Sequence, residues 1–223
     1  MRYYSPLIVL LLLITFSPFS QRNKSSADYK LLYNQAEKLY SSANANAETD
    51  HAAFLKYQQV INILNEKRKY TDTLVDSYIK CGILQMSGNE PDFALHYFTA
   101  AIGIIKSNSQ LPDSLLFQPC LYAGTIYYGQ NDLDSAGYYY KQAELINNNY
   151  PALSESERLF NKFGALYYET GDYNKSISYF KKALSIVESK LPVNTFFVIN
   201  YKNNIATALM KSGKNKEALE IFG

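Results

Sequence analysis

The chain has 223 residues, of which 47% are hydrophobic and 19% charged, and its formal net charge is +2. This composition is that of a globular chain rather than a disordered one, and the nearly balanced charge argues against a nucleic-acid partner. Tyrosine is common, with 21 residues, whereas tryptophan is absent. Because tyrosine packs its ring while its hydroxyl stays near water, this bias favours a structure with a shallow core and much surface.

The first twenty residues have the pattern of an export signal. Arg2 supplies one positive charge, and an apolar run over residues 7–16 follows it. Ten residues of helix rise about 15 Å, half of what the hydrocarbon core of a bilayer requires. We therefore expect residues 1–20 to be a signal peptide that sends the protein to the periplasm, the cell surface or the medium, and residues 21–27 to be a linker. The alternative is an uncleaved membrane anchor over residues 3–19.

From residue 28 onward the sequence repeats itself at an interval of 40 to 42 residues. One position holds a small residue in four successive units: Gly82, Gly124, Gly164 and Ala206. Twelve residues later comes a second small residue: Ala94, Ala136, Ser176 and Ala218. Four residues after that comes an aromatic one: Phe98, Tyr140, Phe180 and Phe222. Several positions that agree in register indicate an internal repeat.

Within each unit the apolar spacing is helical. In the fourth unit, Phe160, Phe163 and Tyr167 recur at i, i+3 and i+7 and so share one helix face. Gly171 suits the left-handed residue that ends a helix, and Asp172 is well placed to cap the next one. The pattern predicts two antiparallel helices joined by a tight turn in each unit. The small residues let the helices cross closely, and the aromatic ring fills the space between them.

This series of residues resembles the tetratricopeptide repeats. The family's Gly–Tyr–Gly–Ala–Phe–Ala series is matched, with serine in place of the first alanine, by Gly164, Tyr167, Gly171, Ser176, Phe180 and Ala183. The long period is similar to the variant found in kinesin light chains and bacterial repeat arms. The resemblance implies an all-α fold, a right-handed superhelical solenoid of antiparallel helix pairs over residues 28–223, with about four and a half repeats.

The fifth unit stops before its second helix reaches the length of the others. Either a partner covers the open end of the solenoid, or the sequence is the front part of a longer protein, and the abrupt end favours the second explanation. In bacterial relatives such arms precede a CHAT caspase-like peptidase domain, or a membrane histidine kinase or helix-turn-helix regulator. A sensing arm of this kind is the alternative to a self-contained scaffold.

The sequence contains no motif for catalysis, for a cofactor or for a metal. Asp132 and Asp134 lie at a predicted turn and helix start, where capping explains them. Cys81 and Cys120 have no histidine or further cysteine nearby, so we expect buried thiols rather than ligands. The chain is therefore predicted not to be an enzyme and to need no cofactor.

The first helix of each unit is expected to line the concave side of the solenoid. In relatives with long repeats, asparagines on this helix hold peptide backbones, and the resemblance assigns that role to Asn161 and Asn203. The candidate groove residues are Tyr128, Arg158, Asn161, Tyr168, Asn200 and Asn203. The alternative is that they are solvated polar residues of the kind found on any repeat surface. The predicted partner is a protein or peptide segment, and membrane contact is expected only through the possible anchor.

Overall fold

The computed structural model describes residues 26–151, 153–190 and 192–221. In these ranges the chain forms ten α-helices and no strand. They are α1 (Ser26–Tyr40), α2 (Ala47–Glu66), α3 (Asp72–Ser87), α4 (Pro91–Ser107), α5 (Phe117–Gly129), α6 (Leu133–Asn149), α7 (Ser156–Glu169), α8 (Tyr173–Glu188), α9 (Thr195–Lys211) and α10 (Asn215–Glu220), with a short 3-10 helix, η1 (Asp113–Leu116), before α5. The predicted signal peptide and the alternative anchor lie outside the described residues.

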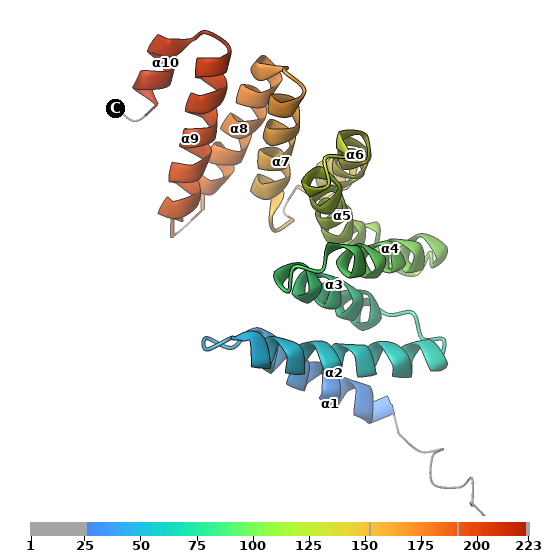
Figure 1. The fold of residues 1–223 in the computed structure, drawn as a ribbon. Coiled ribbons are helices and arrows are strands. Elements are labelled where there is room, and N and C mark those ends of the chain that lie inside the picture. Colours follow the sequence, from blue (N-terminus) through green and yellow to red (C-terminus); the bar gives the residue numbers. More distant parts are fainter. Residues whose placement is uncertain (1–25, 152, 191, 222–223) are drawn as a thin grey trace, which may run out of the picture.

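Consecutive helices form five antiparallel pairs, from α1/α2 to α9/α10, and each pair packs on the next (Figure 1). We number these pairs as units one to five. The helix axes change direction progressively, from nearly horizontal in α1 and α2 to nearly vertical in α8 and α9 (Figure 1). The predicted all-α solenoid of helix pairs is confirmed.

The close crossing of the two helices in units two, three and four depends on a glycine beneath an aromatic ring. A Cβ atom added to the glycine would lie less than 3.0 Å from ring carbons of the second helix, in the pairs Gly82–Phe98, Gly124–Tyr140 and Gly164–Phe180. All three rings are buried. The predicted roles of the small residue and the aromatic are therefore confirmed in these units. The aromatic expected in unit five, Phe222, lies outside the described residues.

The turn between the two helices of a unit also repeats. Units two to five each place one residue with φ between 61° and 81° at this turn, namely Asn89, Asn131, Gly171 and Gly213. The residue after it caps the next helix in two units, since the carboxylates of Asp132 and Asp172 accept hydrogen bonds from the backbone N–H groups of Ser135 and Lys175. The predicted left-handed turn residue and cap are confirmed.

Tyrosine side chains connect one unit to the next. Tyr33 in α1 donates its hydroxyl to Asp76 in α3 at 2.7 Å, and Tyr122 in α5 donates to Glu155 at the start of α7 at 2.9 Å. The Tyr33 ring is partly buried against the apolar cluster of unit one and the first helix of unit two, and the Tyr122 ring against the cluster that runs through units two, three and the start of unit four. Each of these two tyrosines thus contributes apolar area to the core and a hydrogen bond at its edge.

Replacing Gly164 by alanine is expected to destabilise the protein by about 1–3 kcal/mol, because the new methyl group would collide with the Phe180 ring. The direction of this change in stability is informative, because replacing glycine by alanine inside a helix otherwise stabilises a protein by about 1 kcal/mol. Gly103 in α4 is the matched control, because nothing lies within 4 Å of an added Cβ there. The urea concentration at the unfolding midpoint should be lower for Gly164→Ala and higher for Gly103→Ala than for the unmodified protein. Equal shifts in the same direction would contradict this account of the crossing.

Ser176 departs from the small apolar residue of the repeat and leaves a buried hydroxyl with no hydrogen-bond partner among the described residues. Ser176→Ala should therefore stabilise the protein by about 1 kcal/mol. Ser156 is the control, because its buried hydroxyl donates to Asn147, so Ser156→Ala should lower stability. The free energies of unfolding of the two variants test the prediction, and a loss of stability in Ser176→Ala would refute it.

Candidate functional site

A polar pocket lies between the first helices of units four and five, α7 and α9. It has a volume of about 450 Å³ and is lined by Arg158, Asn161, Lys162, Phe197, Asn200, Tyr201, Asn203 and Asn204. We call it the α7–α9 pocket. It brings together four of the six groove residues expected from the sequence.

The repeat itself builds the α7–α9 pocket. On α7 the residues Arg158, Asn161 and Lys162 stand at i, i+3 and i+4, a spacing that places them on one helix face. The equivalent positions on α9, 42 residues later, are Asn200, Asn203 and Asn204. Because units four and five stack in register, the two equivalent faces lie side by side and their polar side chains line one cavity.

An amide pair joins the two helices within the pocket. The Asn204 Nδ2 donates to Asn161 Oδ1 at 2.9 Å. An asparagine amide offers two N–H donors and a carbonyl acceptor, so this hydrogen bond uses the carbonyl of Asn161 and leaves its N–H groups without a partner in the described part of the chain. The rings of Phe197 and Tyr201 stack with centroids 5.9 Å apart and supply the apolar part of the lining.

The charges around the pocket differ in how they are balanced. Arg158 pairs with Glu155 at 2.8 Å, and Glu155 also accepts hydrogen bonds from Gln118 and Tyr122 at 2.9 Å each. Lys162 is half-buried and has no carboxylate partner among the described residues. Burial lowers the pKa of the Lys162 ammonium, and the neighbouring Arg158 charge lowers it further. The pocket lining therefore contains two cations and no acidic side chain.

Two of the expected groove residues, Tyr128 and Tyr168, are not among those that line the α7–α9 pocket. Tyr128 donates its hydroxyl to Glu169 of α7 at 3.5 Å, and the Tyr168 ring packs against the apolar cluster that contains Ile205 and Leu209 of α9. Both tyrosines thus lie at the contact between the first helices of successive units. Sequence reasoning treated them as free because it counted packing within a unit and not between units.

Four lining residues were not expected from the sequence. Lys162 and Asn204 occupy the position next to the predicted Asn161 and Asn203, so the same repeat offset could have identified them. Phe197 and Tyr201 offered no such signal, because the repeat places Glu155 and Leu159 at the equivalent positions of unit four. Burial raises the pKa of the Tyr201 phenol to about 12, with Glu157 adding to the effect.

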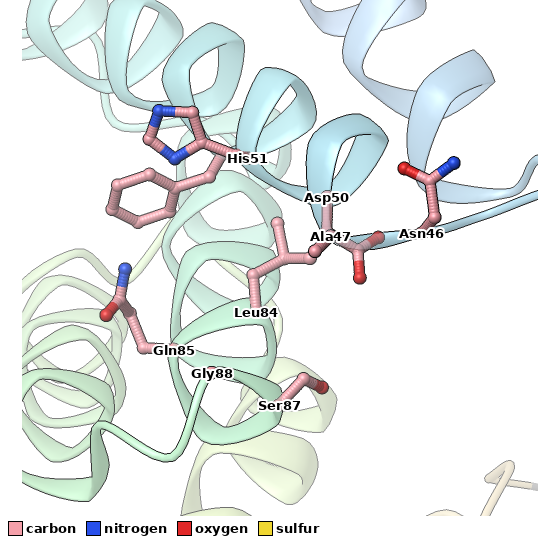
Figure 2. A pocket seen from close by; sticks show the side chains of 9 residues that line it. Asn46, Ala47, Asp50, His51, Leu84, Gln85, Ser87 and Gly88 are labelled. Carbon is pink, nitrogen blue, oxygen red and sulfur yellow. The ribbon is translucent and has the colours of Figure 1, made fainter.

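A second pocket, of about 340 Å³, lies where the start of α2 meets the end of α3 (Figure 2). Asp50 and His51 of α2 face Leu84 and Gln85 of α3 across it. None of the groove residues expected from the sequence lies there. Within the described ranges, the structure holds no group of three or more histidine, cysteine or acidic side chains arranged to bind a metal ion.

Cys81 and Cys120 are buried, unpaired thiols, as the sequence predicts. Burial raises the pKa of both thiol groups, that of Cys120 to about 11. Across the part of the chain that the structure describes, no helix combines the length and the apolar character needed to cross a bilayer.

Residues 157–188 match the sequence model of the tetratricopeptide repeat family. Among solved structures, the chain is similar to the repeats of a putative kinesin light chain from Podosopora anserina, with a TM-score of 0.64 and 12% identity over 89% of this chain and 93% of that one. It is also similar to MamA from Desulfovibrio magneticus RS-1, with a TM-score of 0.62 and 14% identity over 87% and 90%. The Rap conjugation gene regulator of plasmid pLS20, solved with the Phr* peptide, has a TM-score of 0.59 and 14% identity over 94% and 57%.

No curated protein matches the chain. The structural matches show a shared fold, and the family match covers most of unit four. Together they confirm the resemblance to tetratricopeptide repeats with kinesin-light-chain-like units.

The buried cysteines lead to a prediction about reactivity. The thiolate is the reacting species, and burial both hides the sulfur and disfavours its ionisation. We expect the native protein to react with a thiol reagent such as Ellman's reagent at pH 8 far more slowly than the urea-unfolded protein, in which both thiols should react at once. Rapid reaction of one thiol before unfolding would show that its burial is not maintained.

Proposed function

We propose that this protein is a non-catalytic scaffold that binds a peptide, or a segment of another protein, in the groove formed by the first helices of its units. The observation that carries the proposal is the α7–α9 pocket, in which two stacked helices offer equivalent polar faces one repeat apart. An extended peptide backbone also presents donors and acceptors at regular intervals. Asparagine amides can pair with both kinds of group, and Asn161, Asn200 and Asn203 provide them here.

The comparisons support this use of the fold. Stacked helix pairs create extended concave surfaces that repeat proteins use for binding, and the Rap regulator, which shares the fold, was solved in complex with a peptide. The fold is typical of non-catalytic scaffolds, and a binding role needs only the pocket and its amides.

The site of action is part of the proposal. The apolar run and single positive charge within residues 1–20 support export to the periplasm, the cell surface or the medium, whereas an anchor over residues 3–19 would keep the groove at a membrane surface. N-terminal sequencing of the protein recovered from its cell would distinguish the two. A recovered N-terminus at Met1 would contradict cleavage of a signal peptide.

The alternative function is a sensing arm within a longer protein, and it would use the same groove. The intact mass of the protein recovered from its cell distinguishes the two. A mass well above that of the 223-residue chain would favour the arm, and the processed mass of this chain would favour the self-contained scaffold.

The proposed peptide binding is tested with a displayed library of random linear peptides selected on the purified protein. Peptides that enrich should bind at least about tenfold more weakly to an Asn161→Ala/Asn203→Ala variant, because each lost amide removes a hydrogen bond worth about 1 kcal/mol. The control is Asn148→Ala/Asn149→Ala, which removes two exposed asparagines at the end of α6. Failure to enrich any peptide, or equal affinity for all three proteins, would overturn the proposal.

A further inference from the structure

Unit five exposes a group of large apolar side chains on one side. Phe196, Ile199 and Met210 lie along one face of α9, and Leu219 lies on the neighbouring α10. All four are more than half exposed, and Leu219 is 82% exposed. We call these four residues the unit-five face. Apolar area of this size in contact with water is typical of a surface that binds another protein.

The position of Ile199 is a contact between units elsewhere in the chain. Ile199 stands seven residues before the small residue of the repeat and is 55% exposed. In units two, three and four the residues at this position are buried: Val75, Phe117 and Glu157. Exposure at this position is therefore a property of unit five and not of the repeat.

The positions of Met210 and Leu219 show what covers this face in the preceding unit. Their equivalents in unit four, 42 residues earlier, are Tyr168 and Ile177. Both pack in one cluster with Ile205 and Leu209, on the first helix of the next unit. The unit-five face thus has the make-up of a surface on which a further first helix packs, and it is uncovered by the part of the chain that the structure describes.

Unit one, at the opposite end of the array (Figure 1), exposes a residue that the other units bury. Ala36 takes the place of the repeat's glycine there, because it is buried and the rings of Tyr33 and Tyr40, on either side of it in α1, contact the Tyr57 ring. Leu31, five residues before Ala36, is 60% exposed. The residues at this position in units two to five are all buried: Ser77, Pro119, Leu159 and Tyr201.

The repeat indicates which residues would meet if unit one of a second copy packed on the unit-five face. Within the chain, Tyr201 of unit five lies close enough to Glu157 of unit four for this carboxylate to raise the pKa of the tyrosine. The equivalent pair across two copies is Leu31 and Ile199. Both side chains are apolar, so their contact would remove both from water.

Charge favours the pairing of unequal ends. Residues 26–155 contain nine basic and fourteen acidic residues, so their net charge is −5, whereas residues 156–221 contain ten basic and six acidic residues and carry +4. The turns that join the two helices of units five and one differ in the same sense, because residues 211–217 carry three lysines and one glutamate and residues 37–50 three acids and one lysine. Symmetric pairing of two unit-five faces would instead bring two positive regions together.

Turns of stacked units do lie close to each other within the chain. The Lys214 Nζ donates to the Asn174 side chain at 3.3 Å, and Gln130 donates to Asp92 at 3.1 Å, in each case from the turn of one unit to the start of the second helix in the preceding one. The same stacking between two copies would place the lysines of residues 211–217 near the acids of residues 37–50. Opposite charges at this distance attract.

We propose that the unit-five face binds unit one of a second copy of this chain, with Ile199 against Leu31, so that the protein assembles head to tail. A contact between two different faces leaves one of each kind free at the ends of every assembly. The assembly is therefore open-ended and grows with protein concentration. This inference does not depend on the proposed peptide binding.

The experiment measures the mass of the purified protein by sedimentation velocity over a series of concentrations, with the protein in the form that its cell produces. We expect the average mass to rise with concentration and to pass that of a dimer. Raising the salt concentration should reduce the mass at a given protein concentration, because it screens the attraction between the two ends. A mass that stays that of the monomer at every concentration would overturn the inference.

Two variants each alter one end. Leu31→Gln changes unit one, and Ile199→Gln/Met210→Gln changes the unit-five face; all three positions are exposed, and glutamine is a good helix former. Each variant alone should associate at least about tenfold more weakly than the unmodified protein. An equimolar mixture should form dimers and nothing larger, because the intact unit-five face of the first variant binds the intact unit one of the second.

Phe93→Gln is the matched control. Phe93 is a large exposed apolar residue at the start of α4, and the equivalent residues of units four and five, Lys175 and Glu217, are also exposed. Its position is therefore no contact between units, and the control should associate like the unmodified protein. Equal weakening by Phe93→Gln would contradict a specific contact. Dimers that persist in Leu31→Gln and are lost in Ile199→Gln/Met210→Gln would show that two unit-five faces pair symmetrically, which would overturn the head-to-tail arrangement.

Discussion

The contact between a glycine and the aromatic ring above it sets the geometry on which the rest of the structure depends. In units two to four the first helix carries a glycine where the ring of Phe98, Tyr140 or Phe180 lies against its backbone. The two helices of each unit therefore cross at the same place and at close range. Because the left-handed residue of the turn follows seven positions after this glycine in each of these units, the helix length, the crossing and the turn repeat together, and successive pairs can stack with equivalent faces in line.

Stacking in register brings together side chains that are about one repeat apart in the sequence. Asn161 and Asn204 meet in this way, and so do Tyr33 and Asp76. A residue on a first helix thus has its neighbours both in its own unit and in the next one. Tyrosine suits such positions, because its ring packs between units while its hydroxyl reaches a carboxylate at the edge of the core. The same offset of one repeat places two sets of polar residues, on α7 and α9, around one pocket.

The α7–α9 pocket is also where the chain departs from what stability alone favours. Lys162 is held without a carboxylate partner among the described residues, although a neutral residue stands at the equivalent position in α5 and α9. An uncompensated polar group can persist when the surrounding structure is stable enough to hold it, and such groups concentrate at functional sites.

The sequence by itself determined several features that depend on residues close together in the chain. The register of Gly164 and Phe180, the turn at Gly171, the cap at Asp172 and the common helix face of Arg158 and Asn161 all follow from local spacing, and the structure has each of them. Only the tertiary structure decided what happens between units. It placed Tyr128 and Tyr168 at the contacts between successive first helices, and it set Phe197 and Tyr201 beside Lys162. These outcomes depend on the angle and offset at which one helix pair packs on the next, and that geometry results from many side-chain contacts distant in sequence rather than from the period of the repeat.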